Sequence, residues 1–329
     1  MHTDPREEWP LPLAGPSPAA ASSRAAFTAA VRSNAPALIV ADRGLDAAAI
    51  ARAIHERSRP GTPLIVIDCA AVAAQGAQDV DRQLFGARPR AEAHGDLDAV
   101  GSSSALLRAR GGTLYLKHIL DLPAATQRRL ARILRDREVS ATGRRVQVRG
   151  RIIGDAPPSV AVEVGEGHFR SDLFRRLSQT CIPVPGLRER PEDMPELAAR
   201  IAAELRGGAP QAFTQAALTV LSAPAWPGNL DELRGVLERV LRAAPAGAIR
   251  QEDVLAHLPI DGAFARIAPQ ISLREARRQF EREYIASVLE RHRWRMSEAA
   301  RTLGIERANL YRKTRQLGIL RRAGAPIAS

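Results

Sequence analysis

The sequence predicts an α/β domain built on a parallel sheet, followed by an all-α domain that contains a helix-turn-helix. In the first two thirds of the chain, short apolar runs alternate with helical segments, which is typical of a sheet covered by helices on both faces. The last part contains helical apolar spacing and a glycine turn. Charge also separates the parts, because the residues from Ile271 onward have 14 Lys and Arg against six Asp and Glu and therefore hold +8 of the net charge of +12.

The elements of the first part follow from local composition. Residues 1–26 are rich in Pro, Ala and Ser without periodicity and are predicted to be a disordered tail. Residues 27–206 are expected to form the α/β subdomain and residues 207–258 a helical lid subdomain. The predicted buried strands are Ala37–Val40, Leu64–Asp68, Gly112–Leu116 and Arg151–Gly154, and the predicted helices are Ala47–Arg57 and Ala124–Arg137. The remaining segments are a linker at 259–270, a DNA-binding domain at 271–322 and a tail at 323–329.

The C-terminal domain is predicted from its helix boundaries. Ser297 is a candidate N-cap for a short helix, and Gly304 supplies the left-handed backbone that ends that helix. Glu306 is expected to cap the next helix or to place charge at its start. Leu310 and Leu317 share an inner face of this second helix. A helix, a tight glycine turn and a basic helix together indicate a helix-turn-helix, whose second helix enters the major groove.

The basic second helix suggests which residues contact DNA. Arg307, Asn309 and Arg312 are the candidates for base edges, since Arg pairs with guanine and Asn with adenine. The candidates for phosphate contacts are Lys313, Arg315, Arg321 and Arg322. Trp294 and Tyr311 are expected to be packing residues. The alternative interpretation is two surface helices with a solvated basic face.

Composition narrows the classes of partner. A sequence pI near 11.0 favours double-stranded DNA over a membrane surface as the acidic partner. No apolar run approaches the roughly 20 residues of a membrane span, and the N-terminus lacks a signal-peptide pattern. The two cysteines, Cys69 and Cys181, imply no disulfide framework and a reducing, cytoplasmic location. We expect neither a cofactor nor a bound metal.

Several sequence blocks resemble a known family. The blocks are Ala51–His55, Gln83–Gly86, Gly111–Leu116, Asp121–Pro123, Phe169–Leu173, Leu187–Arg190 and Trp226–Leu230. Their order and spacing resemble the AAA+ ATPase domain and lid of bacterial enhancer-binding proteins, the activators that remodel sigma-54 RNA polymerase. The C-terminal domain resembles the Fis-type helix-turn-helix, preceded by a long helix from Ser272 to about Arg291 with an apolar stripe. This stripe consists of Ala276, Phe280, Tyr284, Ile285, Val288 and Leu289. The Fis resemblance implies a homodimer through this domain, and a higher oligomer stays open.

The chain departs from this family where nucleotide would bind. The family has a phosphate loop of the form Gly-x-x-Gly-x-Gly-Lys after the first strand, in which backbone N–H groups and a lysine hold the phosphates. Here only Gly44 remains, Ala47 stands at the lysine position, and Asp42 and Asp46 add carboxylates. The resemblance therefore implies a degenerate nucleotide site that also includes Lys117 and His118.

Other functional positions of the family are also changed. The Asp-Glu pair that serves Mg²⁺ and the attacking water is Lys117-His118 here, and a protonated lysine cannot ligate Mg²⁺. The family's Thr-Asn pair after the fourth strand is replaced here by Ala156-Pro157, and its sensor arginine is replaced by Asp231. Residues 87–95 lack the Phe and Thr of the sigma-54-contacting signature. Packing blocks persist while these positions are lost, so we infer a fold retained for a purpose other than ATP hydrolysis.

One exchange of charge suggests a contact. The phosphate loop has gained Asp46 and the facing strand end has gained Lys117, and these positions adjoin in the family fold. We expect Lys117 to pair with Asp46 or Asp42 and to close the vacated pocket. The alternative is that Lys117 points to solvent.

Three functions remain open. The leading hypothesis is a DNA-binding transcriptional regulator without enzymatic activity, whose AAA+-like domain is an oligomerisation or partner scaffold and which acts by repression or through the ordinary RNA polymerase. The second is an ATP-binding sigma-54-dependent activator with an atypical nucleotide site. The third is an interaction protein that joins and poisons the ring of an intact AAA+ relative, which would suit the retained finger-like arginines Arg170 and Arg176.

Overall fold

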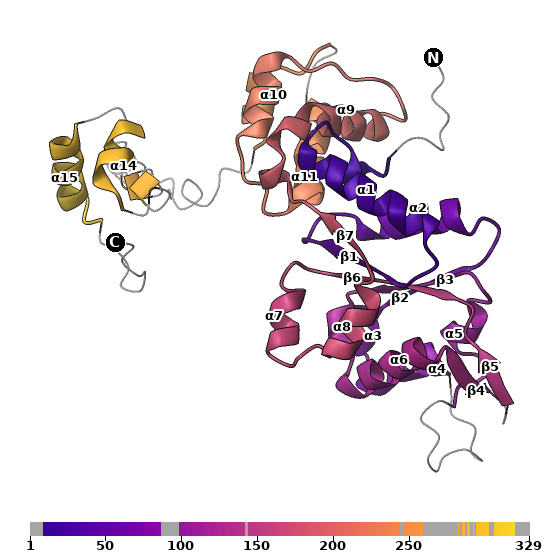
Figure 1. Ribbon diagram of the computed structural model, residues 1–329. Coiled ribbons are helices and arrows are strands. Elements are labelled where there is room, and N and C mark those ends of the chain that lie inside the picture. The colour runs from indigo at the N-terminus through magenta and orange to yellow at the C-terminus, as the bar shows by residue number, and fades with distance from the viewer. Residues whose placement is uncertain are drawn as a thin grey trace. The chain divides into compact units, whose positions relative to one another are not determined.

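The computed structural model divides the chain into two compact units, Met1–His257 and Leu258–Ser329. It describes residues 9–86, 99–141, 144–243, 247–258, 282, 285–286, 288–289, 292, 294–302 and 306–319. Figure 1 shows the first unit as a sheet with helices on both faces and a further helical layer at one end, and the second as a small helical unit. Within the described part of the chain, no helix combines the length and the apolar character that crossing a membrane requires.

The sheet of the first unit has five strands in the order β2-β3-β6-β1-β7, and every neighbouring pair is parallel. The strands are β1 (Ala37–Ala41), β2 (Leu64–Asp68), β3 (Thr113–Lys117), β6 (Arg151–Ala156) and β7 (Thr180–Val184). The predicted parallel α/β fold is confirmed. β3 and β6 lie inside the sheet and are almost entirely buried, which explains their unbroken apolar runs.

Two helices cover one face of the sheet, α1 (Pro18–Arg32) and α2 (Ala47–Ser58). The other face carries α3 (Cys69–Ala73), α4 (Ala77–Phe85), α5 (Ala105–Arg108), α6 (Ala124–Asp136), α7 (Val160–Gly165) and α8 (Ser171–Leu177) (Figure 1). A large apolar cluster lies between this second group and the sheet and includes Phe85, Leu116 and Leu173. A hairpin of β4 (Glu138–Ala141) and β5 (Arg144–Gln147) follows α6.

The described part of the lid layer contains the helices α9 (Met194–Leu205), α10 (Gln215–Ser222), α11 (Asn229–Ala243) and α12 (Gln251–Leu255). Short 3-10 turns occur at η1 (Leu11–Leu13), η3 (Ile119–Asp121), η4 (Leu187–Glu189) and η5 (Pro191–Asp193). Trp226 is buried beside α10 and donates its indole N–H to the carbonyl oxygen of Leu221 at 2.8 Å.

The prediction that residues 1–26 form a disordered tail is wrong for the described residues 9–26. Ser17 is the N-cap of α1, because its side chain accepts a hydrogen bond from the backbone N–H of Ala20. The buried carboxylate of Asp193 accepts hydrogen bonds from the backbone N–H and the hydroxyl of Ser17, both at 2.7 Å. Arg190, which is also buried, donates to the carbonyl oxygen of Pro12 at 2.8 Å. Contacts with residues far along the chain therefore hold this segment in place, although its own sequence has no apolar periodicity.

The second unit contains α14 (Met296–Thr302) and α15 (Arg307–Gln316). Its apolar cluster is formed by Ile285, Val288, Leu289, Ala299, Ala300, Leu310 and Leu317. The prediction that Leu310 and Leu317 face inward is confirmed, since both are buried. Ser297 was predicted to be an N-cap and is not, because α14 begins one residue earlier at Met296.

Candidate functional site

The loop between β1 and α2 holds most of the predicted nucleotide-site residues, and two of its backbone N–H groups are bonded to Asp42 within the loop. The N–H of Arg43 donates to the Asp42 carboxylate at 2.9 Å, and the N–H of Leu45 donates to the Asp42 carbonyl at 3.2 Å. Asp46 is the N-cap of α2 and accepts the N–H of Ala49 at 3.0 Å. A carboxylate thus occupies the helix N-terminus that would otherwise attract a phosphate.

The lid packs directly on this loop. The side-chain amide of Asn229 donates to the carbonyl oxygen of Arg43 at 2.7 Å, and the N–H of Asp231 donates to the carbonyl oxygen of Gly44 at 3.2 Å. Gly44 has a φ of +78°, and a Cβ there would overlap the carbonyl oxygen of Gly228. Glycine is therefore required at position 44 for close packing between the loop and the lid.

The predicted pairing of Lys117 with Asp46 or Asp42 is wrong. The ammonium group of Lys117 lies 3.2 Å from Oδ2 of Asp68 instead. The physical reason is strand register, because Asp68 and Lys117 are directly opposed at the ends of the parallel strands β2 and β3. Asp68 also accepts the N–H of Ala71 at 3.1 Å as the N-cap of α3. Both side chains of the pair are about one third exposed, so the pair contributes about 0–1 kcal/mol to the free energy of unfolding.

A second carboxylate, Asp155, occupies the same edge of the sheet and was missed by the sequence analysis. It is 7% exposed and accepts a short hydrogen bond from the Tyr115 hydroxyl and one from the backbone N–H of His118 at 3.0 Å. The ring Nδ1 of His118 is 3.9 Å from Asp155, and the residue has a left-handed backbone with φ of +52°. The sequence signal that could have found Asp155 is an acidic residue inside an otherwise apolar strand.

These carboxylates make this edge of the sheet electronegative. Burial, followed by repulsion from Asp155 and Asp68, raises the pKa of the Cys69 thiol to about 12. Burial, followed by the charge of Asp155, also raises the pKa of Tyr115. A polyphosphate placed here would meet several negative charges, and Lys117 at this edge is already paired with Asp68.

The finger-like arginines belong to the α8 segment. Arg170 precedes α8, and its Nε and Nη2 donate to the two carboxylate oxygens of Asp172 at 3.0 and 2.8 Å. Hydrogen bonds from Arg170 lower the pKa of Asp172. The buried amide of Gln127 positions this segment, because its oxygen accepts the backbone N–H of Arg170 at 2.9 Å. Arg176 lies in the last turn of α8.

One cluster of described residues has the composition of a metal site. Glu163, Glu166 and His168 bring their possible ligand atoms within 4.8 Å of one another. His168 already contacts both carboxylates, at 3.1 and 3.4 Å, and the cluster lies at the surface. It therefore has the arrangement of a surface ion-pair group.

Helix α15 presents the predicted DNA contacts at its surface. Arg307, Arg312 and Arg315 are exposed, whereas Asn309 and Lys313 are half-buried. Glu306 occupies the N-cap position but makes no side-chain capping bond. A helix whose apolar side is held by a small core and whose other side carries arginines suits insertion into a major groove.

Two further predictions for this unit have different outcomes. Tyr311 was expected to be a packing residue and is not, because it is 51% exposed and lies 6.0 Å below the guanidinium of Arg307. Trp294 packs against the apolar cluster as expected. The following predicted features lie outside the described residues: Gly304, Arg321, Arg322, the segment 87–95, and Ala276, Phe280 and Tyr284 of the long helix.

The sequence matches three family descriptions along its length. Residues 13–183 match "Sigma-54 interaction domain", residues 188–263 match "AAA+ ATPase lid domain", and residues 276–322 match "Bacterial regulatory protein, Fis family".

Curated relatives cover both units. NtrX of Azorhizobium caulinodans, a nitrogen assimilation regulatory protein, is 36% identical over 302 residues, which is 87% of this chain and 64% of that protein. The response regulator PilR of Pseudomonas aeruginosa is 34% identical over 95% of this chain and 72% of its own length. The transcriptional regulatory protein ZraR of Escherichia coli is 34% identical over 92% and 68%. The chain thus spans less than two thirds of NtrX and somewhat more of the other two.

Crystal structures of NtrX from Brucella abortus have a similar fold. One has a TM-score of 0.60 at 32% identity and covers 94% of this chain and 70% of that chain. Two others are complexes, one with ADP (TM-score 0.60, 31% identity) and one with ATP (TM-score 0.61, 31% identity).

Proposed function

Because the chain belongs to the family of sigma-54 transcriptional regulators with a sigma-54 interaction domain, an AAA+ lid and a Fis-type helix-turn-helix, we propose that it regulates transcription by binding double-stranded DNA without hydrolysing ATP. The AAA+-like unit then acts as a scaffold for oligomerisation or for a partner. The observation that carries the proposal is the loop between β1 and α2, where the Asp42 carboxylate accepts the N–H of Arg43 and the Asp46 carboxylate caps the N-terminus of α2.

The chemistry of the strand ends supports the absence of ATP hydrolysis. Lys117 stands where the resemblance places a metal ligand, and it is held by Asp68. The neighbouring His118 has Asp155 as its partner and lies on a carboxylate-rich edge. Hard cations such as Mg²⁺ need oxygen ligands and near-ideal geometry, which a lysine-occupied position does not provide.

The Fis-type unit supports a dimer on a roughly palindromic DNA site. Ile285, Val288 and Leu289 share a buried cluster with α15, so the preceding segment is tied to the recognition helix. In this arrangement two recognition helices would contact half-sites about one helical turn apart. Partners such as RNA polymerase or a related AAA+ regulator remain part of the proposal.

The DNA-binding proposal is tested by selecting duplexes from a random pool with the full chain and measuring their affinity. Arg312→Ala should cost about 1–3 kcal/mol and relax specificity at one base position, because Arg312 is a candidate for base contact. The matched variant Arg315→Ala should weaken binding to all DNA sequences alike. It should also reduce the slope of log affinity against log salt concentration by about one. If no duplex is enriched over random competitor DNA, the proposal fails.

An ATPase with an atypical site is the second candidate, favoured by the ADP and ATP complexes of the Brucella NtrX structures. Measuring ATP binding and turnover distinguishes the two candidates. The native chain is compared with a variant carrying Asp46→Gly, Ala47→Lys, Lys117→Asp and His118→Glu. Mg²⁺-dependent turnover by the native chain would make the ATPase the leading function, whereas no binding by the native chain supports the scaffold.

A further inference from the structure

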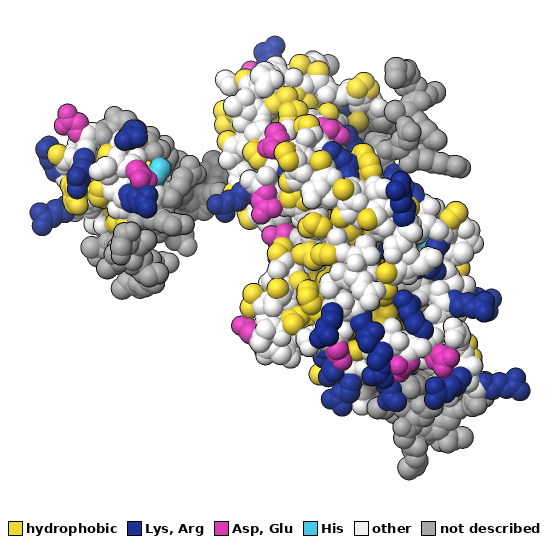
Figure 2. All heavy atoms as spheres, viewed as in Figure 1, with side chains coloured by type: hydrophobic (Ala, Val, Ile, Leu, Met, Phe, Trp, Pro, Cys, Tyr) yellow, Lys and Arg dark blue, Asp and Glu magenta, His cyan; other side chains and the backbone are white. Residues whose placement is uncertain are grey.

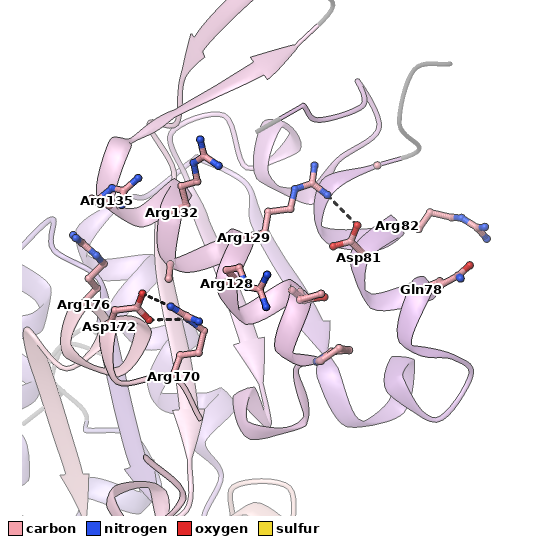
Figure 3. Close-up of a pocket in the computed structure, with 15 residues that line it drawn as sticks. Gln78, Asp81, Arg82, Arg128, Arg129, Arg132, Arg135, Arg170, Asp172 and Arg176 are labelled. Carbon is pink, nitrogen blue, oxygen red and sulfur yellow. Dashed lines mark hydrogen bonds and ion pairs between the residues drawn. The ribbon is translucent and has the colours of Figure 1, made fainter. Parts of the chain in front are cut away.

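An arginine-rich groove lies between α4, α6 and α8, on the opposite face of the sheet from α1 and α2. Its volume is about 860 Å³, and seven of its fifteen lining residues are arginines, against two aspartates (Figure 3). Lys and Arg side chains also gather at the surface over this part of the first unit (Figure 2). We call it the arginine groove.

Helix α6 forms one wall of the groove, and the spacing of its arginines places them on that wall. Arg128, Arg132 and Arg135 follow one another at intervals of four and three residues, which places them along one face of the helix. The opposite face of α6 is apolar and packs into the main core through Leu130, Ile133 and Leu134. Burial of that face therefore fixes the direction in which the arginines point.

Some of the charge is compensated by carboxylates. Arg129 is 4% exposed, and its Nη1 lies 2.9 Å from Oδ2 of Asp81. Arg170 is held by both oxygens of Asp172. Arg135 lies 2.7 Å from Asp136 at the end of α6. Among the residues that the structure describes, the groove keeps a positive excess after these pairs are counted.

Two side chains of the groove, those of Arg128 and Arg176, make no hydrogen bond or ion pair with a described residue. Figure 3 shows the guanidinium of Arg128 between the Arg170–Asp172 pair and the Arg129–Asp81 pair. The charge of Arg176 acts on two neighbours. After burial, it is the second cause that lowers the pKa of Arg137, and together with the larger effect of Arg135 it lowers the pKa of Asp136. A ligand bringing negative charge would relieve this repulsion.

The groove indicates the chemical class of that ligand. Several guanidinium groups around one concavity need several negative charges in a small volume, and each phosphate group carries about −1.5 to −2 at neutral pH. Guanidinium also matches phosphate oxygens in a bidentate way. The volume falls in the range of about 300–1,000 Å³ that is usual for small-molecule sites. Pro123, Ala125 and Ala131 add apolar surface for a part of the ligand without charge.

We infer that the arginine groove binds a small polyphosphorylated molecule, whose phosphates contact Arg128 and Arg176. The site belongs to a single chain, is separate from the loop between β1 and α2, and does not depend on DNA binding. It gives the first unit a ligand that the carboxylate-rich edge of the sheet would repel.

The test is calorimetric titration of the full chain with inorganic tripolyphosphate at low ionic strength. Arg128→Gln and Arg176→Gln should each weaken binding about tenfold or more, because each removes a charged hydrogen bond. The matched control is Arg188→Gln, which makes the same change of charge at an exposed position in η4 outside the groove. The control should change affinity by less than about twofold. Circular dichroism and thermal melting confirm that each variant is folded.

Several results would overturn the inference. The native chain could fail to bind tripolyphosphate, or it could bind with an affinity that neither groove variant changes, in which case phosphate binds elsewhere. An equal loss in Arg188→Gln would show attraction to net charge alone. Binding of polyglutamate, but not of tripolyphosphate, with the same dependence on Arg128 would identify an acidic protein as the occupant.

Discussion

Asp46 should both stabilise α2 and repel phosphates, and two substitutions at this position separate the effects. Asp46→Asn keeps a side-chain oxygen that can accept the N–H of Ala49 and removes the negative charge. Asp46→Ala removes both. A comparison of the two variants therefore tests the explanation of the loop between β1 and α2 without altering its length.

The size of the repulsion depends on exposure. Two unit charges at about 4 Å interact by about 1 kcal/mol in water and about 4 kcal/mol at an effective dielectric constant of 20. Asp46 is exposed, so we expect the lower part of this range, about 1–2 kcal/mol. Asp46→Asn should therefore bind ATP about five- to thirtyfold more tightly than the native chain, and Asp46→Ala should show a similar gain.

Stability should separate the same two variants. Loss of the N-cap in Asp46→Ala should cost about 0.5–2 kcal/mol in the free energy of unfolding, whereas Asp46→Asn should be nearly neutral. Urea denaturation measures the first quantity, and titration with a fluorescent ATP analogue at low salt measures the affinity. If the native chain binds ATP as tightly as Asp46→Asn does, the carboxylate does not repel phosphate and our explanation of the site is wrong.

Three further outcomes are expected. Asp193→Ala should lower the free energy of unfolding by about 3–5 kcal/mol, because it leaves the buried Arg190 without its carboxylate; a loss below about 1 kcal/mol in urea denaturation would contradict this. Asp172→Asn should destabilise the protein at neutral pH, and this loss should shrink as the pH falls below the ordinary aspartate pKa of 3.8 and through the lowered pKa of the folded state, because the ionised carboxylate is what Arg170 stabilises; thermal melting across pH measures this. Iodoacetamide at neutral pH should label the exposed Cys181 before Cys69, whose burial raises its pKa to about 12; equal labelling rates by mass spectrometry would refute the burial.

The strands that could be predicted are those buried on both faces. β3 and β6 lie inside a parallel sheet, so their side chains are apolar without alternation, and the run itself marks the strand. The inner face of α15 was equally visible, because Leu310 and Leu317 are spaced two turns apart. In both cases the apolar pattern lies within one short segment, because that segment itself is buried.

The elements that could not be predicted depend on distant partners. Nothing in the Pro-, Ala- and Ser-rich start of the chain has apolar periodicity, yet α1 is ordered because Ser17 contacts Asp193. The partner of Lys117 was missed for a different reason. The sequence suggested the neighbouring loop, whereas strand register places Asp68 directly opposite. Register follows from the alignment of two strands and is not visible in either strand alone.

The carboxyl ends of the strands are where open α/β sheets bind ligands, and here the chain fills that edge itself. Asp46 caps the N-terminus of α2, and Asp68 pairs with Lys117. Asp155 accepts hydrogen bonds from the Tyr115 hydroxyl and from the backbone N–H of His118. Each carboxylate has a donor from the same chain, so a nucleotide would have to break these contacts as well as meet their charge. A sheet edge satisfied in this way can keep the fold without nucleotide, and α15 and the arginine groove are two described surfaces where we propose that partners bind.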